Sequence, residues 1–269
     1  MKLKIMEWNI KGEASLGWNN GYEIQKAVVD IVIGQKADIF VLTAFVAASG
    51  MDYLFDQLKK HDYIWFLTFE TGKNGILIGI KETIIDKNKL VSDVYDKKAV
   101  YSIDNGCNIL RVICSLKNGS PLTVLGCRME TGKCENQDQL KEQYNFEKKS
   151  FDDILIPTIG EAEGLYIVCG DFNNARCLGN LDNKYNEKDY DGKAQCNYNL
   201  NIIKDRFEEL KFVLADVKKG APIPTHKIFP DDHIFLRGFT VTDCNSIPVD
   251  NLSDHFIIMA KVEICEENS

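Results

Sequence analysis

The chain has 269 residues, of which 45% are hydrophobic and 27% are charged, and its net charge is −8. This composition is ordinary for a globular protein that buries a sizeable core. The acidic balance argues against broad electrostatic capture of nucleic acid, although a local basic groove or a bound cation still admits a nucleic-acid substrate.

Nine cysteines occur, and none forms a CxxC pair. Several lie in apolar runs, among them Cys114 and Cys169, so we expect buried free thiols in a reducing compartment rather than a zinc site. The N-terminal residues lack the apolar length of a signal peptide, and no apolar stretch is long enough to span a bilayer. We therefore expect a cytoplasmic monomer that is not membrane-bound, with no protein partner evident.

Strands dominate the first half of the predicted order of elements. An alternating strand over residues 3–10 places Asn9 at its end. A helix follows over 22–35, then a strand over 37–42 whose apolar character indicates burial on both faces, then a helix over 51–61. Further strands are predicted over residues 63–69, 74–81, 99–104, 108–116 and 121–128.

The second half begins with an amphipathic helix over residues 137–155, followed by a very apolar strand over 165–169. A polar loop over 178–198 is unusually long for a compact domain and favours a substrate-side role. The remaining helix and strands are expected over residues 200–210, 213–217, 232–237 and 255–263. This order predicts one α/β (α+β) domain over residues 1–269, a four-layer sandwich of two packed, mostly antiparallel β-sheets flanked by helices.

Polar side chains follow or begin four of the predicted strands. They are Asn9, Asp171 with Asn173, Asp232 with His233, and Asp254 with His255. Singly, each would be a solvated loop residue or a turn cap. Carboxylates beside apolar strands are costly unless they are paired, hydrogen-bonded or metal-bound. Three of them with a histidine therefore indicate a hard-cation site with a general acid or base beside it.

An ordered set of short motifs runs through essentially the whole chain. It comprises WNI (8–10), ADIFVL (37–42), NGILIGIK (74–81), GDFN (170–173), PTH (224–226), DHIF (232–235) and SDH (253–255). GDFN or SDH alone is a weak signal, but the complete series resembles the endonuclease/exonuclease/phosphatase superfamily. That group includes pancreatic-type deoxyribonucleases, abasic-site endonucleases, tyrosyl-DNA phosphodiesterases and inositol polyphosphate 5-phosphatases.

The resemblance implies a phosphodiester hydrolase and a role for each matching residue. Asp171 would orient or deprotonate the attacking water, and Asn173 would hold a phosphate oxygen. Asp232 would hydrogen-bond His255, which fixes the tautomer and favours the imidazolium that faces the phosphate. Arg128 stands where many relatives have a histidine or tyrosine facing the phosphate, and its guanidinium can serve there as a forked donor.

The resemblance also implies a Mg²⁺ site, with Mn²⁺ as an alternative. Asn9 would hydrogen-bond within the metal and phosphate site, and Asp254 would lie at the metal or at a second-metal position. Arg176 resembles an arginine that relatives use close to GDFN, and His226 would shape the site loop. Trp18 could offer a stacking face to a base. Arg176 and Trp18 can equally be ordinary surface or packing residues, and His226 is expected to shape the loop rather than to transfer protons.

One position departs from the family pattern. Relatives carry a glutamate, the principal magnesium ligand, where this chain has Ala44. Alanine cannot ligate a cation, and no carboxylate nearby in sequence can substitute for it, so metal binding should weaken. Because the other site residues are in place, an engineered glutamate-to-alanine change is favoured over a natural pseudoenzyme. Such a change would slow the parent enzyme by about two to four orders of magnitude.

Three functions remain open at this point. The favoured one is a metal-dependent nuclease acting on DNA or RNA, seen here in an inactivated form. The second is a phosphatase or phosphodiesterase for a small phosphorylated metabolite or nucleotide, which the acidic net charge favours somewhat. The third is a non-catalytic module that binds phosphate or nucleic acid.

Overall fold

The computed structural model describes the secondary structure around most of the predicted motifs. The described residues are 1–11, 24, 26–46, 50–68, 75–89, 107–129, 149–160, 164–173, 200–218, 221–226, 230–249 and 252–265. The predicted strand over 99–104, the loop over 178–198 and most of the predicted helix over 137–155 lie outside them. So do two candidate substrate-binding residues, Trp18 and Arg176.

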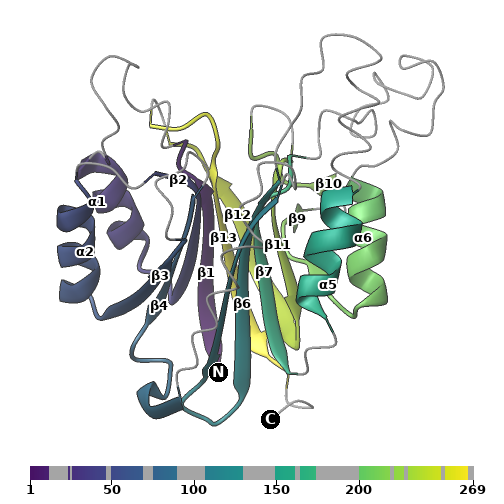
Figure 1. The fold of residues 1–269 in the computed structure, drawn as a ribbon, viewed down its shortest axis with the longest axis horizontal. Helices are drawn as coiled ribbons and strands as arrows, with labels where there is room; N and C mark the ends of the chain where they lie inside the picture. The colour runs from purple at the N-terminus through teal and green to yellow at the C-terminus, as the bar shows by residue number, and fades with distance from the viewer. Residues whose placement is uncertain are drawn as a thin grey trace.

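Two mixed β-sheets form the centre of the molecule (Figure 1). The first has the order β12 (Phe239–Ile247), β13 (Ile257–Ile264), β1 (Lys2–Asn9), β2 (Ile39–Phe45), β4 (Gly75–Lys81) and β3 (Tyr63–Leu67). The second has the order β5 (Cys107–Ser115), β6 (Pro121–Met129), β7 (Leu165–Asp171), β11 (Asp232–Arg237) and β8 (Val213–Leu214). β1 with β2 and β6 with β7 are parallel pairs, and the other neighbours are antiparallel, as predicted.

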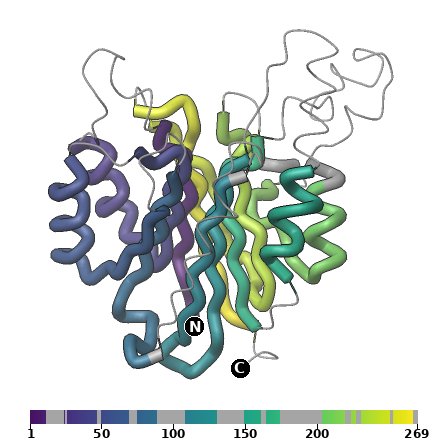
Figure 2. Tube along the Cα trace, in the orientation of Figure 1, coloured from purple at the N-terminus to yellow at the C-terminus, as the bar shows by residue number. Residues whose placement is uncertain are grey.

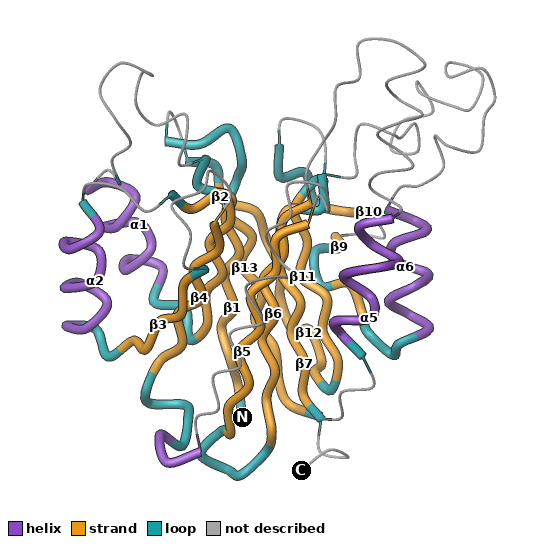
Figure 3. The backbone as a smooth tube through the Cα atoms, in the orientation of Figure 1, coloured by secondary structure: helices purple, strands orange, loops and turns teal. Residues whose placement is uncertain are grey.

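Helices cover the outer face of each sheet (Figure 3). On one side lie α1 (Lys26–Gln35) and α2 (Met51–Lys60). On the other lie α5 (Ile156–Ile159), which continues a π-helical turn η2 (Phe151–Leu155), and α6 (Leu200–Glu209). A short 3₁₀ turn η1 (Lys87–Lys89) and a two-stranded ribbon of β9 (Val217–Lys218) and β10 (Ala221–Pro222) complete the described elements. The predicted four-layer sandwich is confirmed.

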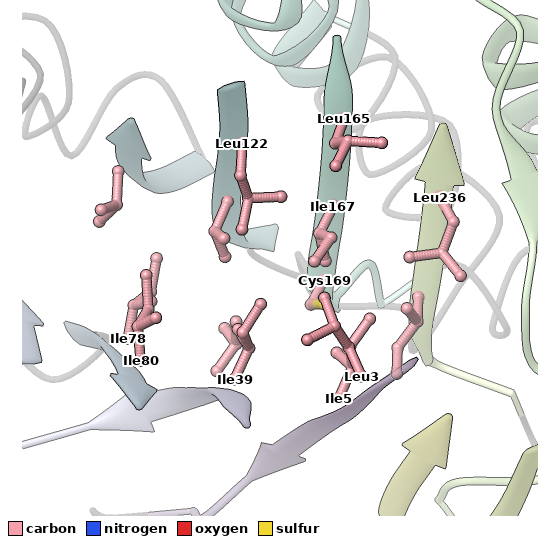
Figure 4. Packing of buried hydrophobic residues seen from close by; sticks show 14 of the residues in the cluster. Leu3, Ile5, Ile39, Ile78, Ile80, Leu122, Leu165, Ile167, Cys169 and Leu236 are labelled. Carbon is pink, nitrogen blue, oxygen red and sulfur yellow. The ribbon is translucent and has the colours of Figure 1, made fainter. Parts of the chain in front are cut away.

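The central core lies between the two sheets. Leu3, Ile5 and Ile39 of the first sheet face Leu122 and Ile167 of the second in this apolar layer (Figure 4). Alternate residues of β1, Met6 and Trp8, pack instead into the cluster under α1 and α2. Because β1 is covered on both faces, any polar side chain on it is buried and needs a specific partner.

Two details of the predicted strands are corrected. The sequence prediction has no strand for residues 239–247, yet β12 pairs there with β13 along an edge of the sheet. Its side chains are mostly polar and half exposed, so the segment lacks the apolar signal of the interior strands. The predicted strand over 213–217 is two short strands, β8 and β9, because Asp216 between them turns into the interior.

The first and last strands lie side by side although they come from opposite ends of the sequence (Figure 2). Lys2 pairs with Glu263, and Glu7 pairs with Ile258 in antiparallel register. The end of β1 therefore lies beside the segment that leads into β13, which carries Asp254 and His255. Among the described residues, no helix is long and apolar enough to cross a bilayer. Cys114 and Cys169 are buried free thiols, as predicted.

Candidate active site

Six polar residues that are far apart in the sequence meet at one edge of the two sheets. Asn9 at the end of β1 donates a hydrogen bond to Asp171 at the end of β7, which joins the two sheets there. Asp171 lies opposite Asp232, the first residue of β11, in the antiparallel strand register. One ligand atom each from Asp171, Asp232 and His255 lie within 4.8 Å of one another. Asn173 and Asp254 join the same group through the contacts described below.

Asp171 is fully buried, and fixed donors hold both of its oxygens. Oδ2 accepts hydrogen bonds from Asn9 Nδ2 at 2.8 Å and from Asn173 Nδ2 at 3.0 Å, and Oδ1 accepts one from the Asn173 backbone N–H at 2.9 Å. Burial, together with the neighbouring Asp232 carboxylate, raises the pKa of Asp171 to about 7. A carboxylate that titrates near neutrality in a fixed position is suited to accept a proton from water.

The Asn173 amide is already engaged in this arrangement. Besides Asp171, it donates a hydrogen bond to the Met129 carbonyl oxygen, and its backbone adopts a left-handed φ of 48°. In this geometry Asn173 holds Asp171 in place, and its contact with a phosphate oxygen remains a prediction.

His255 forms the charged pair that the sequence predicted with Asp232. The His255 Nδ1–H donates to Asp232 Oδ2 over 2.7 Å, and both residues are buried. Burial alone would lower the pKa of His255, but the Asp232 carboxylate raises it to about 9. His255 is therefore an imidazolium at neutral pH, and its Nε2 is the ring nitrogen left to face a phosphate.

A set of hydrogen bonds fixes the turn that carries His255. Ser253 Oγ donates to the Asn9 carbonyl oxygen at 2.7 Å and accepts from the His255 backbone N–H at 3.1 Å. The Trp8 indole N–H donates to the His255 carbonyl oxygen at 3.2 Å. β1 thereby positions the histidine that precedes β13.

His226 packs directly on His255. The two rings are stacked, with centroids 4.6 Å apart and an interplanar angle of 7°. His226 Nδ1 lies 3.0 Å from Asp231 Oδ2, and His226 Nε2 lies 3.6 Å from Asp254 Oδ2. This placement suits a residue that shapes the site.

Asp254 is paired with a residue that the sequence analysis missed. Lys11 Nζ lies 2.6 Å from Asp254 Oδ2, and the Lys11 backbone N–H donates to Asn9 Oδ1 at 2.9 Å. Burial would raise the pKa of Asp254, but the hydrogen bond from Lys11 and the charge of His255 lower it. Asp254 therefore stays ionised. The only sequence signal for Lys11 is its place two residues after Asn9.

Arg128 lies at the end of β6, in register with Asp171 on the neighbouring strand. Its Nε is 3.5 Å from Asp171 Oδ2, and its side chain is one-fifth exposed. The guanidinium is thus held beside the candidate base and keeps part of its surface open to an anionic ligand.

Ala44 occupies the place where the resemblance puts a glutamate. It lies in β2 next to Thr43, which pairs with Asn9, and its side chain is buried. The pairing of β2 with β4 is irregular between Leu42 and Phe45, and Ala44 has a left-handed φ of 51°. Position 44 therefore lies at the edge of the site, but its alanine side chain has no atom that can bind a cation.

Glu7 is a second residue that the sequence analysis did not select. It is fully buried on β1, and its Oε1 accepts a 3.4 Å contact from Thr43 Oγ1. Burial, with the nearby Asp232 and Asp171 carboxylates, raises the pKa of Glu7 well above its ordinary value. The sequence signal that could have identified Glu7 is a glutamate inside a strand that is covered on both faces.

The described residues fit a hard divalent cation. Carboxylate oxygens of Glu7 (Oε2), Asp232 (Oδ1) and Asp254 (Oδ1) are buried and have no hydrogen-bond partner. Two groups of side chains have ligand atoms within 4.8 Å of one another: Asp171, Asp232 and His255, and His226, Asp254 and His255. Oxygen donors with unmet bonding capacity are what Mg²⁺ or Mn²⁺ uses in proteins.

Asp216 forms another buried pair behind the site. Its Oδ2 lies 2.7 Å from His233 Nδ1, its Oδ1 accepts from the Ile234 backbone N–H at 3.0 Å, and both side chains of the pair are fully buried. Burial opposes a proton on His233, but Asp216 raises the pKa of that ring. The pair anchors the segment after β8 to β11, the strand that presents Asp232. An acidic residue after an apolar run was the signal that the sequence analysis passed over.

Replacing Asp216 by alanine is expected to lower the free energy of unfolding by about 3–5 kcal/mol, because it removes one partner of a buried ion pair. Urea unfolding measures this change. Asp243→Ala is the matched control, since Asp243 pairs with Lys261 at the surface and no measurable change is expected. Equal stability of the two variants would contradict the anchoring role.

No family model and no curated protein sequence matches the chain, but solved structures do. An endonuclease/exonuclease/phosphatase from Beutenbergia cavernae DSM 12333 aligns with a TM-score of 0.66 and 13% identity, over 98% of this chain and 72% of that one. D. rerio TDP2 complexed with a single-strand DNA product gives a TM-score of 0.57 and 16% identity, over 97% and 99%. ANGEL2, a 2′,3′-cyclic phosphatase in complex with adenosine-2′,3′-vanadate, gives 0.62 and 12%, over 98% and 96%. The chain has the endonuclease/exonuclease/phosphatase fold.

Proposed function

We propose that the protein is a divalent-cation-dependent phosphodiester hydrolase, with DNA or RNA as the favoured substrate. The observation that carries the proposal is the pairing of two chemically distinct groups at one sheet edge. A buried carboxylate, Asp171, has a pKa of about 7, and a buried imidazolium, His255, has a pKa of about 9. At neutral pH one can accept a proton while the other carries positive charge.

The chain's own residues divide the reaction between them. Asp171, held by Asn9 and Asn173, orients a water and takes its proton. His255, held by Asp232, donates hydrogen bonds to a phosphoryl oxygen as negative charge grows there. Arg128, beside Asp171, adds a second cationic donor for the same charge.

The proposed cofactor is Mg²⁺, with Mn²⁺ able to replace it. Asp254 and Asn9 would hold it, together with the unpaired oxygen of Asp232. When bound, the cation neutralises charge on the phosphate and stabilises the leaving oxygen.

Ala44 would impair this chemistry. A parent form with glutamate at position 44 would be the fully active enzyme, and the present chain would be slow. The alternative, a natural pseudoenzyme that binds phosphate or nucleic acid, predicts no gain when glutamate is placed there.

The similar structures and the net charge of the chain bear on two candidate substrate classes. TDP2 with a single-strand DNA product favours a nucleic-acid substrate. The adenosine-2′,3′-vanadate complex of ANGEL2 and the net charge of −8 favour the second candidate, a small phosphodiester or nucleotide. We keep the cytoplasmic location, the monomeric state and a substrate-side role for residues 178–198 as predictions.

A cleavage panel tests the proposal. Plasmid DNA, single-stranded DNA and RNA oligonucleotides, and small phosphodiesters are incubated with the chain and with its Ala44→Glu form. Cleavage of at least one substrate is expected with Mg²⁺ or Mn²⁺, and a chelator should abolish it. Absence of cation-dependent cleavage by both forms on every substrate would overturn the enzyme proposal.

A further inference from the structure

Glu7 is a buried carboxylate to which the sequence pattern gives no task. It lies two residues before Asn9 on β1, on the face that carries Leu3 and Ile5 toward the second sheet (Figure 4). Beyond Ile5 the apolar layer therefore gives way to Glu7 and then to Asn9, directly below the site. A fully buried glutamate in such a layer is costly unless a partner compensates it.

The protein side chains do not supply that compensation. The contact from Thr43 Oγ1 to Glu7 Oε1 is long, at 3.4 Å, and Oε2 has no hydrogen-bond partner. Asp232 Oδ1 and Asp254 Oδ1 are also unpartnered. Asp232 is the carboxylate whose charge acts most strongly on Glu7, so these two neighbouring residues share a deficit that a cation removes.

Glu7 also contacts the residue that precedes position 44, where the glutamate of the family pattern is absent. Thr43 contacts Glu7 through its hydroxyl and pairs with Asn9 through the strand register, and Ala44 is the next residue. Glu7 therefore approaches the site from β1, one strand away from the place where a glutamate on β2 would approach it.

We propose that Glu7 supplies, from β1, the carboxylate that position 44 lacks, and binds the divalent cation directly or through one of its waters. The inference rests on the proposed function, because it assigns a ligand to the cation of the same site. It revises the expectation that no carboxylate substitutes for Ala44: none is close in sequence, but Glu7 is close in space. The chain would then retain cation binding at reduced affinity.

Binding of Mn²⁺ alone tests the inference, with free Mn²⁺ counted by electron paramagnetic resonance. The four proteins are the unaltered chain, Glu7→Gln, Ala44→Glu and the double variant. Glu7→Gln is expected to weaken Mn²⁺ binding by about 10- to 100-fold in the unaltered chain, the size typical for losing a group that supports a metal. In the Ala44→Glu background the same substitution should cost less than about threefold, because the introduced carboxylate on β2 takes over the role.

Two further variants control the comparison. Asp38→Asn removes a half-buried carboxylate that lies just before β2, at the end of that strand away from Ala44, where it accepts a hydrogen bond from the Lys4 backbone N–H. It changes the charge equally and should leave Mn²⁺ affinity unchanged. Glu7→Asp keeps the charge but shortens the side chain, so this variant should bind Mn²⁺ with intermediate affinity. It also provides a test if Glu7→Gln does not fold.

The outcomes separate the inference from the proposed function. Equal Mn²⁺ affinity for the unaltered chain, Glu7→Gln and Glu7→Asp, or no Mn²⁺ binding by the unaltered chain, would overturn the role of Glu7. If Mn²⁺ binding depends on Glu7 as expected but no form cleaves any phosphodiester, the inference stands and the hydrolase proposal fails.

Discussion

Replacing His255 by alanine in the Ala44→Glu form is expected to lower kcat by about 10²–10⁴-fold, the range typical of a lost acid–base or charge-stabilising group. The structure gives the reason. His255 is buried, is held in one orientation by Asp232 at 2.7 Å, and is an imidazolium at neutral pH. No other described side chain has the same position, so alanine removes the donor to the phosphoryl oxygen. Initial rates on the best substrate of the panel measure the loss.

His61→Ala is the matched control, because His61 is an exposed histidine at the end of α2 and should leave kcat unchanged. NMR titration of the imidazole then separates a charged role from a packing role. In the cation-free protein, His255 should titrate with a pKa of about 9, and Asp232→Asn should move that pKa toward its ordinary value. Since the folded pKa exceeds the unfolded one, the stability that this pair contributes is complete at acidic pH and is lost as pH rises through about 9. Near-normal turnover of His255→Ala would remove the histidine from the mechanism.

Placing glutamate at position 44 is expected to raise the cation-dependent rate by about two to four orders of magnitude. Ala44 already holds a left-handed backbone at the site edge, so an unbranched side chain adds no new backbone strain. The new carboxylate would add a negative charge beside the buried carboxylates of the site, so without a cation Ala44→Glu should be less stable than the unaltered chain. Mg²⁺ should recover that loss by binding the folded state. Rates with Mg²⁺, and Tm with and without it, provide the two measurements.

Ala44→Gln is the control for size, since it has the shape of glutamate without the charge. It should neither raise the rate nor gain stability from Mg²⁺ beyond the unaltered chain. An Ala44→Glu variant that binds Mg²⁺ but is as slow as the unaltered chain would favour the non-catalytic binding module.

The sequence located most of the site because of a simple rule of chain geometry. Polar residues that directly follow buried strands have to emerge at the edge where those strands end. Asn9 and Asp171 obey this rule in both sheets, and their 2.8 Å hydrogen bond joins the two edges. The four-layer fold followed from the same strand and helix periodicities.

The residues that escaped prediction are those whose environment is created by the second sheet. Glu7 has the local pattern of an ordinary strand residue, and only the packing of β1 against the facing sheet makes it buried and unpaired. Asp216 falls inside the predicted strand over 213–217, and only the position of β11, with His233 beside it, shows its role. β12 escaped for the opposite reason, since an exposed edge strand needs no apolar signal. Local sequence does not encode which surfaces will meet.

The hydrogen bond from the Trp8 indole to His255 spans 247 positions of the chain, and β1 and β13 pair directly. The turn that carries His255 is therefore fixed only when two strands that are far apart in the sequence have paired. Pairing of such distant strands is slow compared with local folding. Assembly of the site should consequently depend on folding of the whole first sheet, and no local segment should form it alone.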